Sequence, residues 1–83
     1  MDEQLVGRVT HYYTRLQVAV VEVIDGDLRV GDTIRVLGNI SNFTEEVESM
    51  EIDHAPVQVG DLVGIKVSER VRVNDLIYRS EHR

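Results

Sequence analysis

The chain contains no cysteine and no tryptophan, and it has only one proline and one lysine in 83 residues. The lack of cysteine excludes a disulfide scaffold, a thiolate zinc site and a cysteine nucleophile. The lone lysine, Lys66, is not part of a Gly-Lys-Ser/Thr sequence, which excludes the phosphate-binding loop of nucleotide hydrolases. The longest apolar run has four residues, and the acidic start Met1-Asp2-Glu3 is unlike a secretion signal. We therefore expect a cytoplasmic protein with no membrane partner.

Other catalytic patterns are also missing. The three histidines, His11, His54 and His82, lie far apart without the spacing of paired metal ligands. No serine stands in a nucleophile-elbow sequence, and the carboxylates either follow turn residues or belong to one acidic run. The sequence therefore predicts a protein that is not an enzyme, with no metal, no cofactor and no catalytic residues.

The net charge of -6 disfavours binding that depends on neutralising phosphates, and we expect no DNA partner. Five acids and no base fall within residues 45–53. Eight of the nine basic residues are arginines, which suit bidentate phosphate contacts and surface ion pairs equally well. Two interpretations stay open: a solvated surface of mixed charge, or a local basic patch formed by Arg8, Arg15, Arg70 and Arg72.

A short motif occurs three times and predicts a tight turn followed by a strand. Its copies are Val30-Gly31-Asp32-Thr33-Ile34, Val59-Gly60-Asp61-Leu62-Val63 and Val73-Asn74-Asp75-Leu76-Ile77. Glycine, and next best asparagine, adopts the left-handed backbone that such a turn requires. The aspartate can accept hydrogen bonds from nearby backbone N–H groups, and the branched residue two positions later faces inward. The predicted turn residues are Gly31, Asp32, Gly60, Asp61, Asn74 and Asp75.

Apolar alternation between the turns predicts six strands, over residues 4–13, 16–23, 33–37, 43–53, 62–67 and 76–78. Gly7 in the first strand indicates a bulge or a close backbone approach. The fourth strand loses its alternation between Val47 and Met50, which favours a β-bulge over a competing helix. Short strands with closely spaced turns predict an all-β fold, a small six-stranded closed antiparallel β barrel without exposed edges. We expect one domain over residues 1–83, with its core at about 5–79 and a polar tail at 80–83.

The strand over residues 16–23 is apolar on both faces. Ala19, Val21 and Val23 form one set, and Leu16, Val18 and Val20 lie on the opposite face. A strand of this kind is usually covered, either by a neighbouring loop or by a partner. The outward set Leu16, Val18 and Val20 is therefore a candidate protein interface.

His11-Tyr12-Tyr13 is the one aromatic cluster of the chain. Its rings could stack on nucleotide bases while arginines hold phosphates. Alternation also sends the two tyrosines to opposite faces, so that one of them would fill the core. The candidate residues for binding an RNA end are Arg8, His11, Tyr12, Arg70 and Arg72.

The order of these motifs resembles the second-domain β barrel of translational GTPases of the elongation factor Tu type, above all stand-alone translation elongation factor-like proteins. A related barrel caps the C-terminus of collagenase-like peptidases, some of which act in tRNA modification. The residues that carry the likeness are Val6-Gly7-Arg8-Val9-Thr10-His11-Tyr12, Leu28-Arg29-Val30-Gly31-Asp32-Thr33-Ile34, Val47-Glu48-Ser49-Met50, Gly60-Asp61 and Val63-Gly64-Ile65-Lys66-Val67.

This resemblance covers residues 5–79 and implies a non-catalytic binding module in translation or tRNA handling. The implied partner is tRNA or a ribosome-associated protein. The alternative is a protein-interaction module, monomer or weak dimer, that docks onto a GTPase or tRNA-modifying enzyme or self-associates through its exposed apolar strand.

Overall fold

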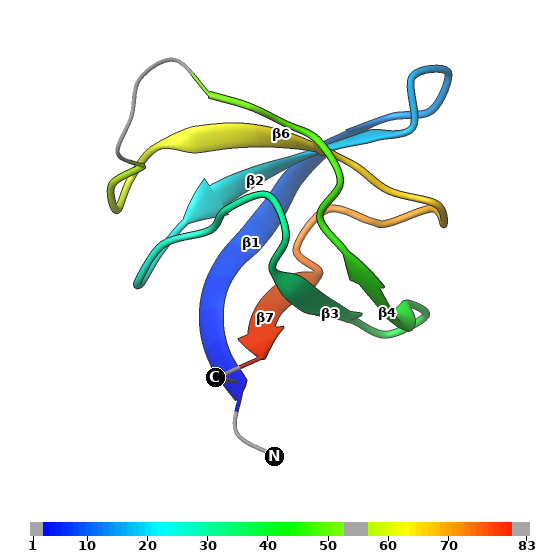
Figure 1. The fold of residues 1–83 in the computed structure, drawn as a ribbon. Helices are drawn as coiled ribbons and strands as arrows, with labels where there is room; N and C mark the ends of the chain where they lie inside the picture. The colour runs from blue at the N-terminus through cyan, green and yellow to red at the C-terminus, as the bar shows by residue number, and fades with distance from the viewer. Residues whose placement is uncertain (1–2, 53–56, 81–83) are drawn as a thin grey trace.

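The computed structural model describes residues 3–52 and 57–80, which form seven β-strands in one antiparallel sheet (Figure 1). The order across the sheet is β4-β3-β7-β1-β2-β6-β5. Among the described residues there is no helix with the length and apolarity that crossing a membrane requires. The strands are β1 (Glu3–Tyr13), β2 (Val18–Val23), β3 (Thr33–Leu37), β4 (Asn42–Glu46), β5 (Met50–Glu51), β6 (Leu62–Lys66) and β7 (Leu76–Ser80).

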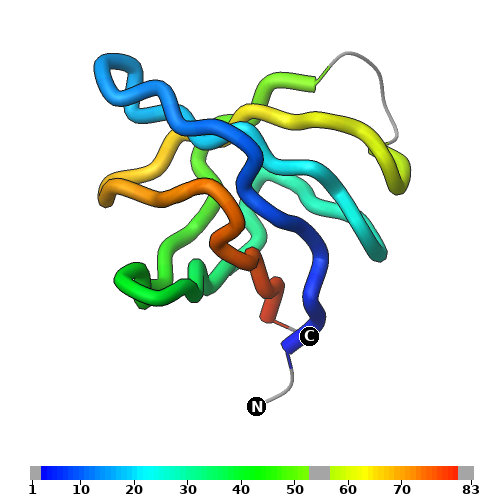
Figure 2. Tube along the Cα trace, turned by 180° about the vertical axis from the view of Figure 1, so that it is seen from behind, coloured from blue at the N-terminus to red at the C-terminus, as the bar shows by residue number. Residues whose placement is uncertain are grey.

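The sheet is a curled half-barrel, and the prediction of a closed six-stranded barrel is wrong. The two edge strands, β4 and β5, follow one another in the sequence with only residues 47–49 between them. Four residue steps span at most about 14 Å, so the edges must approach each other and the sheet must curl (Figure 2). Within the described residues, however, no ladder of hydrogen bonds joins β4 to β5. The chain itself, and not strand pairing, connects the two edges.

The predicted fourth strand divides into β4 and β5 where its alternation fails. Val47 lies in the break, and its side chain is buried. Its N–H donates to the Asp32 carbonyl and its own carbonyl accepts from the Gly31 N–H, both at 2.8 Å. These two bonds hold the chain against the first turn, so the segment crosses between sheet edges instead of bulging within one strand. Residue 53, the expected end of that strand, lies outside the described residues.

β1 is the longest strand, and it belongs to both halves of the sheet. Its first half pairs with β7 and its second half with β2, and each ladder contains one register shift. The shift against β7 lies between Leu5 and Gly7. A Cβ at Gly7 would also collide with the side chain of Val21. The expectation of a bulge or a close approach at this glycine is therefore confirmed on both counts.

The fully buried core of the described residues is aliphatic, and Tyr12, Phe43 and Met50 pack against it as partly buried residues. Branched residues two positions after the motif aspartates point into it, as the sequence predicted: Ile34, Val63 and Ile77 are each at most 1% exposed. On β2 the inward set is Ala19, Val21 and Val23. The core residues are Val6, Val9, Ala19, Val21, Val23, Leu28, Ile34, Val36, Val47, Val63, Ile65, Val67, Val71 and Ile77.

The three copies of the repeated motif form three turns with the same hydrogen bonds. In each, the aspartate carboxylate accepts a backbone N–H from the residue three positions earlier, and the aspartate N–H donates to the carbonyl of that residue. The residue before the aspartate has a positive φ, which a type II turn requires. This φ is 98° at Gly31, 98° at Gly60 and 79° at Asn74.

An ion pair joins β1 to β3 near the start of the described chain. Arg35 donates from Nη2 to Glu3 Oε1 at 2.8 Å and from Nε to Glu3 Oε2 at 3.0 Å, and its guanidinium lies 5.5 Å from the ring centroid of Tyr78. The hydrogen bonds from Arg35, and then its charge, hold the pKa of Glu3 below its usual value. Because the folded pKa is the lower one, the pair stabilises the fold above the ordinary pKa of glutamate. That stabilisation is lost as the pH falls through the folded pKa.

We therefore expect Glu3→Gln to lower the free energy of unfolding at neutral pH and to have less effect in acid. Urea unfolding of both proteins between about pH 7 and pH 3 measures the difference, which should shrink as the wild-type glutamate becomes protonated. Glu46→Gln is the matched control, since Glu46 is exposed and forms no ion pair among the described residues. A Glu3→Gln difference of the same size at both ends of the range would contradict this account.

Candidate functional site

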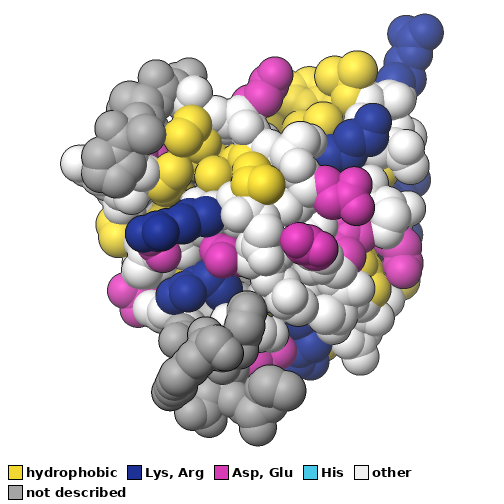
Figure 3. Space-filling view, in the orientation of Figure 1, with side chains coloured by type: hydrophobic (Ala, Val, Ile, Leu, Met, Phe, Trp, Pro, Cys, Tyr) yellow, Lys and Arg dark blue, Asp and Glu magenta, His cyan; other side chains and the backbone are white. Residues whose placement is uncertain are grey.

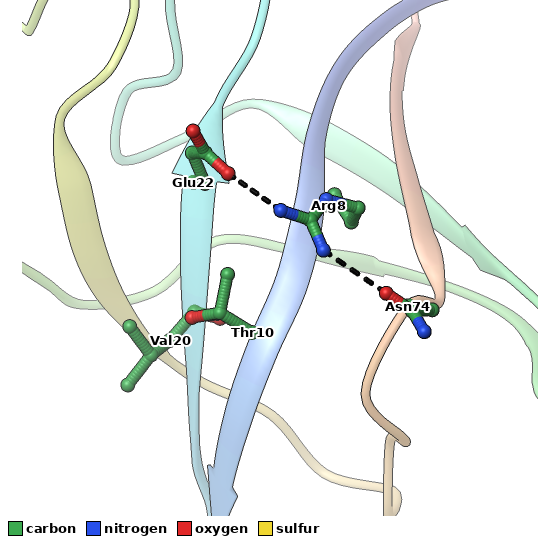
Figure 4. Close-up of polar contacts among 5 residues, drawn as sticks. All are labelled: Arg8, Thr10, Val20, Glu22 and Asn74. Carbon is green, nitrogen blue, oxygen red and sulfur yellow. Dashed lines mark hydrogen bonds and ion pairs between the residues drawn. The ribbon is translucent and has the colours of Figure 1, made fainter.

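The residues predicted to bind an RNA end do not share one open surface. The guanidinium of Arg8 lies between two neighbours (Figure 4). Its Nη2 donates to Glu22 Oε1 at 2.7 Å, and its Nη1 donates to Asn74 Oδ1 at 3.0 Å. Arg8 therefore joins β1 to β2 and to the turn before β7. Its charge is compensated by Glu22, which leaves it poorly placed for a phosphate.

The aromatic cluster is divided between the two faces of the sheet. Tyr12 is partly buried against the core, whereas Tyr13 is 49% exposed. His11 meets Tyr13 edge-on, with 4.4 Å between the ring centroids. Tyr12 thus lies on the inner face and Arg8 on the outer one. The other two residues of this set, Arg70 and Arg72, are exposed in the loop between β6 and β7.

A groove of about 800 Å³, here named the outer groove, lies over the outward faces of β2 and β6. Its apolar side chains include three that are strongly exposed: Leu16 at 63%, Leu62 at 57% and Tyr13 at 49%. In the view of Figure 3, hydrophobic side chains reach the surface next to acidic and basic ones. The groove is lined by Tyr13, Leu16, Val18, Val20, Ser49, Met50, Glu51, Ile52, Leu62, Val63, Gly64 and Lys66.

Gly64 forms part of the floor of the outer groove. It lies in register with Val20 on β2 and with Glu51 on β5. A Cβ there would lie 3.3 Å from Val18 Cγ1 and 3.9 Å from Glu51 Cβ, so the space between these side chains is narrow but open. A strand glycine of this kind often marks a place where a ligand or another backbone comes close.

The predicted interface residues Leu16, Val18 and Val20 all line the outer groove. Reasoning from the sequence missed the residues of the opposite wall, such as Leu62 and Met50. These residues line the outer groove because β2 pairs with β6 and β6 pairs with β5, and the sequence alone does not specify these pairings.

A second groove of about 510 Å³, named the acidic groove, continues the outer groove, because Ser49 and Lys66 line both. One of its carboxylates is bound within the chain: Glu45 Oε1 accepts hydrogen bonds from the N–H and the hydroxyl of Ser68. Glu46 and Glu48 are exposed and form no ion pair within the described residues. Across all residues that the structure describes, no three His, Asp or Glu side chains lie close enough to share a metal ion.

No family model matches the chain. The chain is 39% identical over 77 residues, 88% of its length, to an uncharacterized protease of Methanocaldococcus jannaschii. It is 33% identical over 82 residues, 94% of its length, to a collagenase of Porphyromonas gingivalis. It spans only about a fifth of these curated relatives: 19% of the protease and 23% of the collagenase.

Among solved structures, the chain is similar to the C-terminal domain of a Geobacillus thermoleovorans protein described as a U32 peptidase. The TM-score is 0.82 over 94% of this chain and 93% of that one, at 20% identity. A selenomethionine variant of the same domain gives a TM-score of 0.77 at 24% identity. These likenesses establish the fold.

The resemblance to translation factors is wrong. The relatives are named as a protease and collagenases, and the structural neighbours are structures of the C-terminal domain of a protein described as a U32 peptidase. The expected role in translation or tRNA handling is overturned with it, as is the alternative of docking onto a GTPase or tRNA-modifying enzyme. Many residues of the motifs that carried the resemblance lie in turns or in the core, and such residues specify a fold that several functions share.

Proposed function

We propose that the chain is an accessory domain of the kind found at the C-terminus of U32 peptidases, and that it binds polypeptide without cleaving it. The observation that carries this proposal is that the alignments cover nearly all of this chain but only a small part of each relative. The match takes in 88–94% of the chain but only 19–23% of the protease and collagenase relatives. Most of each relative lies outside the match, and that remainder has room for a separate catalytic domain.

The described side chains support a binding role. The three motif aspartates are engaged in turns, and Arg8, Glu22, Glu3 and Arg35 form ion pairs between strands. The outer groove stays open to a partner, and its lining combines exposed apolar side chains with polar ones. Binding sites commonly combine apolar surface with a few polar groups, and polypeptide is the substrate class of the proteases named above.

Grafting tests the proposal. The collagenase of P. gingivalis is compared with a truncated form that lacks its 82-residue matching segment, and with a chimera in which the present chain replaces that segment. We expect the truncated form to cleave collagen at least about tenfold more slowly than the chimera, which corresponds to a loss of about 1.4 kcal/mol of substrate binding. The present chain alone should not cleave collagen.

The matched control uses two exposed branched aliphatic side chains at distant places. Leu16→Asp changes the wall of the outer groove, whereas Ile40→Asp changes the loop between β3 and β4, far from the β1–β2 hairpin in Figures 1 and 2. Only Leu16→Asp should reduce cleavage by the chimera. Collagen cleavage by the isolated chain, or equal rates for the truncated form and the chimera, would refute the proposed function.

A further inference from the structure

We propose that the outer groove and the acidic groove together bind one polypeptide segment in which apolar side chains stand next to lysine or arginine. This inference rests on the proposed function and adds the chemistry of the bound segment. The two grooves share Ser49 and Lys66, so one extended segment can pass from the first into the second. The domain measures 31 × 30 × 20 Å, and ten extended residues, about 33 Å long, suffice to cross it.

The outer groove supplies the apolar part of the site. Leu16, Leu62 and Tyr13 expose about half or more of their surface there, above the half-buried Val18 and Val20. Removing such surface from water favours association in proportion to its area. The segment that binds must therefore bring apolar side chains of its own.

The glycine on the floor allows that segment to approach closely. Gly64 leaves the strip between Val18 and Glu51 free of any side chain from β6. An apolar side chain of the bound segment can enter this strip. A larger residue in place of Gly64 would fill the same space without requiring a left-handed backbone, since its φ is not positive.

Charge decides what kind of segment binds. Exposed Glu51 in the outer groove is followed by Glu46 and Glu48 in the acidic groove, and no ion pair of the described residues uses any of these three carboxylates. Among the residues that the structure describes, Lys66 is the one basic residue that lines either groove. The surface is therefore complementary to a cationic segment, and it repels nucleic acid and anionic lipid.

The test uses the isolated 83-residue chain and three fluorescent ten-residue peptides. One alternates valine with lysine, one alternates valine with glutamate, and one alternates serine with lysine. Fluorescence anisotropy at low salt should give saturable binding of the valine–lysine peptide. The serine–lysine peptide should bind at least about tenfold more weakly, because it lacks the apolar contacts. The valine–glutamate peptide should not bind, and the valine–lysine complex should weaken but persist in about 0.5 M salt, where exposed charges are screened.

Three variants locate the site, and two control for their chemistry. Leu16→Asp, Glu48→Lys and Gly64→Val should each weaken valine–lysine binding about fivefold or more. Ile40→Asp and Glu69→Lys make the same kinds of change at exposed positions that line neither groove, and they should stay within about twofold. Thermal unfolding of each variant identifies any that lose binding by losing the fold. Gly64→Val, whose Cβ needs only a small shift of Val18, should remain folded.

Equal binding of the lysine and glutamate peptides would overturn the inference. So would equal losses in the groove and control variants, no saturable binding at low salt, or tighter binding of tRNA or anionic vesicles than of the peptide. Failure here is separable from failure of the proposed function. If the chimera cleaves collagen but the isolated chain binds no peptide, only this inference fails. If the isolated chain binds the peptide but the chimera is inactive, the proposed role in peptidase action fails.

Discussion

Gly38→Ala should destabilise the domain by about 3 kcal/mol, which is a large part of the roughly 4–12 kcal/mol expected for 83 residues. Gly38 follows β3, and a Cβ there would overlap the carboxylate of Asp75. This carboxylate cannot simply move away. Asp75 is only 4% exposed, and its Oδ2 accepts the N–H of Arg72 at 2.9 Å, which closes the third turn. The substitution therefore combines overpacking with the loss of a partly buried hydrogen bond.

Urea unfolding followed by circular dichroism measures this loss, and a double variant identifies its cause. Gly38→Ala in an Asp75→Ala background should cost much less than it does in the wild-type chain, because the colliding carboxylate is gone. Gly64→Ala is the matched control, since its Cβ would lie no closer than 3.3 Å to any neighbour, and the half-buried Val18 side chain needs to shift only slightly. It should change stability by less than about 1 kcal/mol. Equal costs at Gly38 and Gly64 would show that loss of glycine as such, and not the contact with Asp75, is responsible.

The sequence predicted the local structure well, because local chemistry determines it. Val-Gly-Asp and Val-Asn-Asp place a residue that tolerates positive φ before a side chain that can cap the turn, and both properties belong to the residues themselves. The inward positions of Ile34, Val63 and Ile77 follow from the strict alternation of a strand. Neither prediction needed to know which strands are neighbours.

The closure of the sheet could not be predicted in the same way. The acidic segment 43–53 read as one strand with a bulge, because a lapse in alternation does not reveal whether the chain continues along the same neighbour. In the structure Val47 turns inward and bonds to residues 31 and 32, and the chain then joins β6 at the opposite edge. The path of the chain at this point depends on contacts between residues far apart in sequence. The sequence therefore predicted a closed barrel where the structure has a half-barrel.

The candidate site was predicted only in part for a related reason. Leu16, Val18 and Val20 were identifiable because apolar residues on both faces of one strand are visible in the sequence. Gly64 carries no side chain and gives no signal of its own, although it forms part of the groove floor. The arginines gave a misleading signal: counting positive charges could not show that Arg8 is already paired with Glu22.

Gly7→Ala should cost about 2 kcal/mol, through overpacking at the centre of the sheet. Gly7 pairs with Val23 on β2 and with Ile77 on β7, so the backbone on either side is fixed by strands. A Cβ at this position would collide with Cγ1 of Val21 and would lie 3.0 Å from the carbonyl oxygen of Glu22. Val21 is fully buried and β-branched, so it has little freedom to rotate away.

A double-mutant cycle with Val21→Ala tests whether this one contact is responsible. Val21→Ala alone should cost about 2 kcal/mol, because it leaves a cavity in an aliphatic core. In the double variant the methyl group added in place of the Gly7 hydrogen can occupy part of that cavity. The destabilisation of the double variant should therefore be smaller than the sum of the two single destabilisations by at least about 1 kcal/mol. Additive costs, within about 0.5 kcal/mol, would place the strain at the Glu22 carbonyl instead. Only a change in the backbone of β2 would then relieve the strain of Gly7→Ala. Glycine would be required at position 7 because the backbones of β1 and β2 approach each other closely there, and not because of the Val21 side chain.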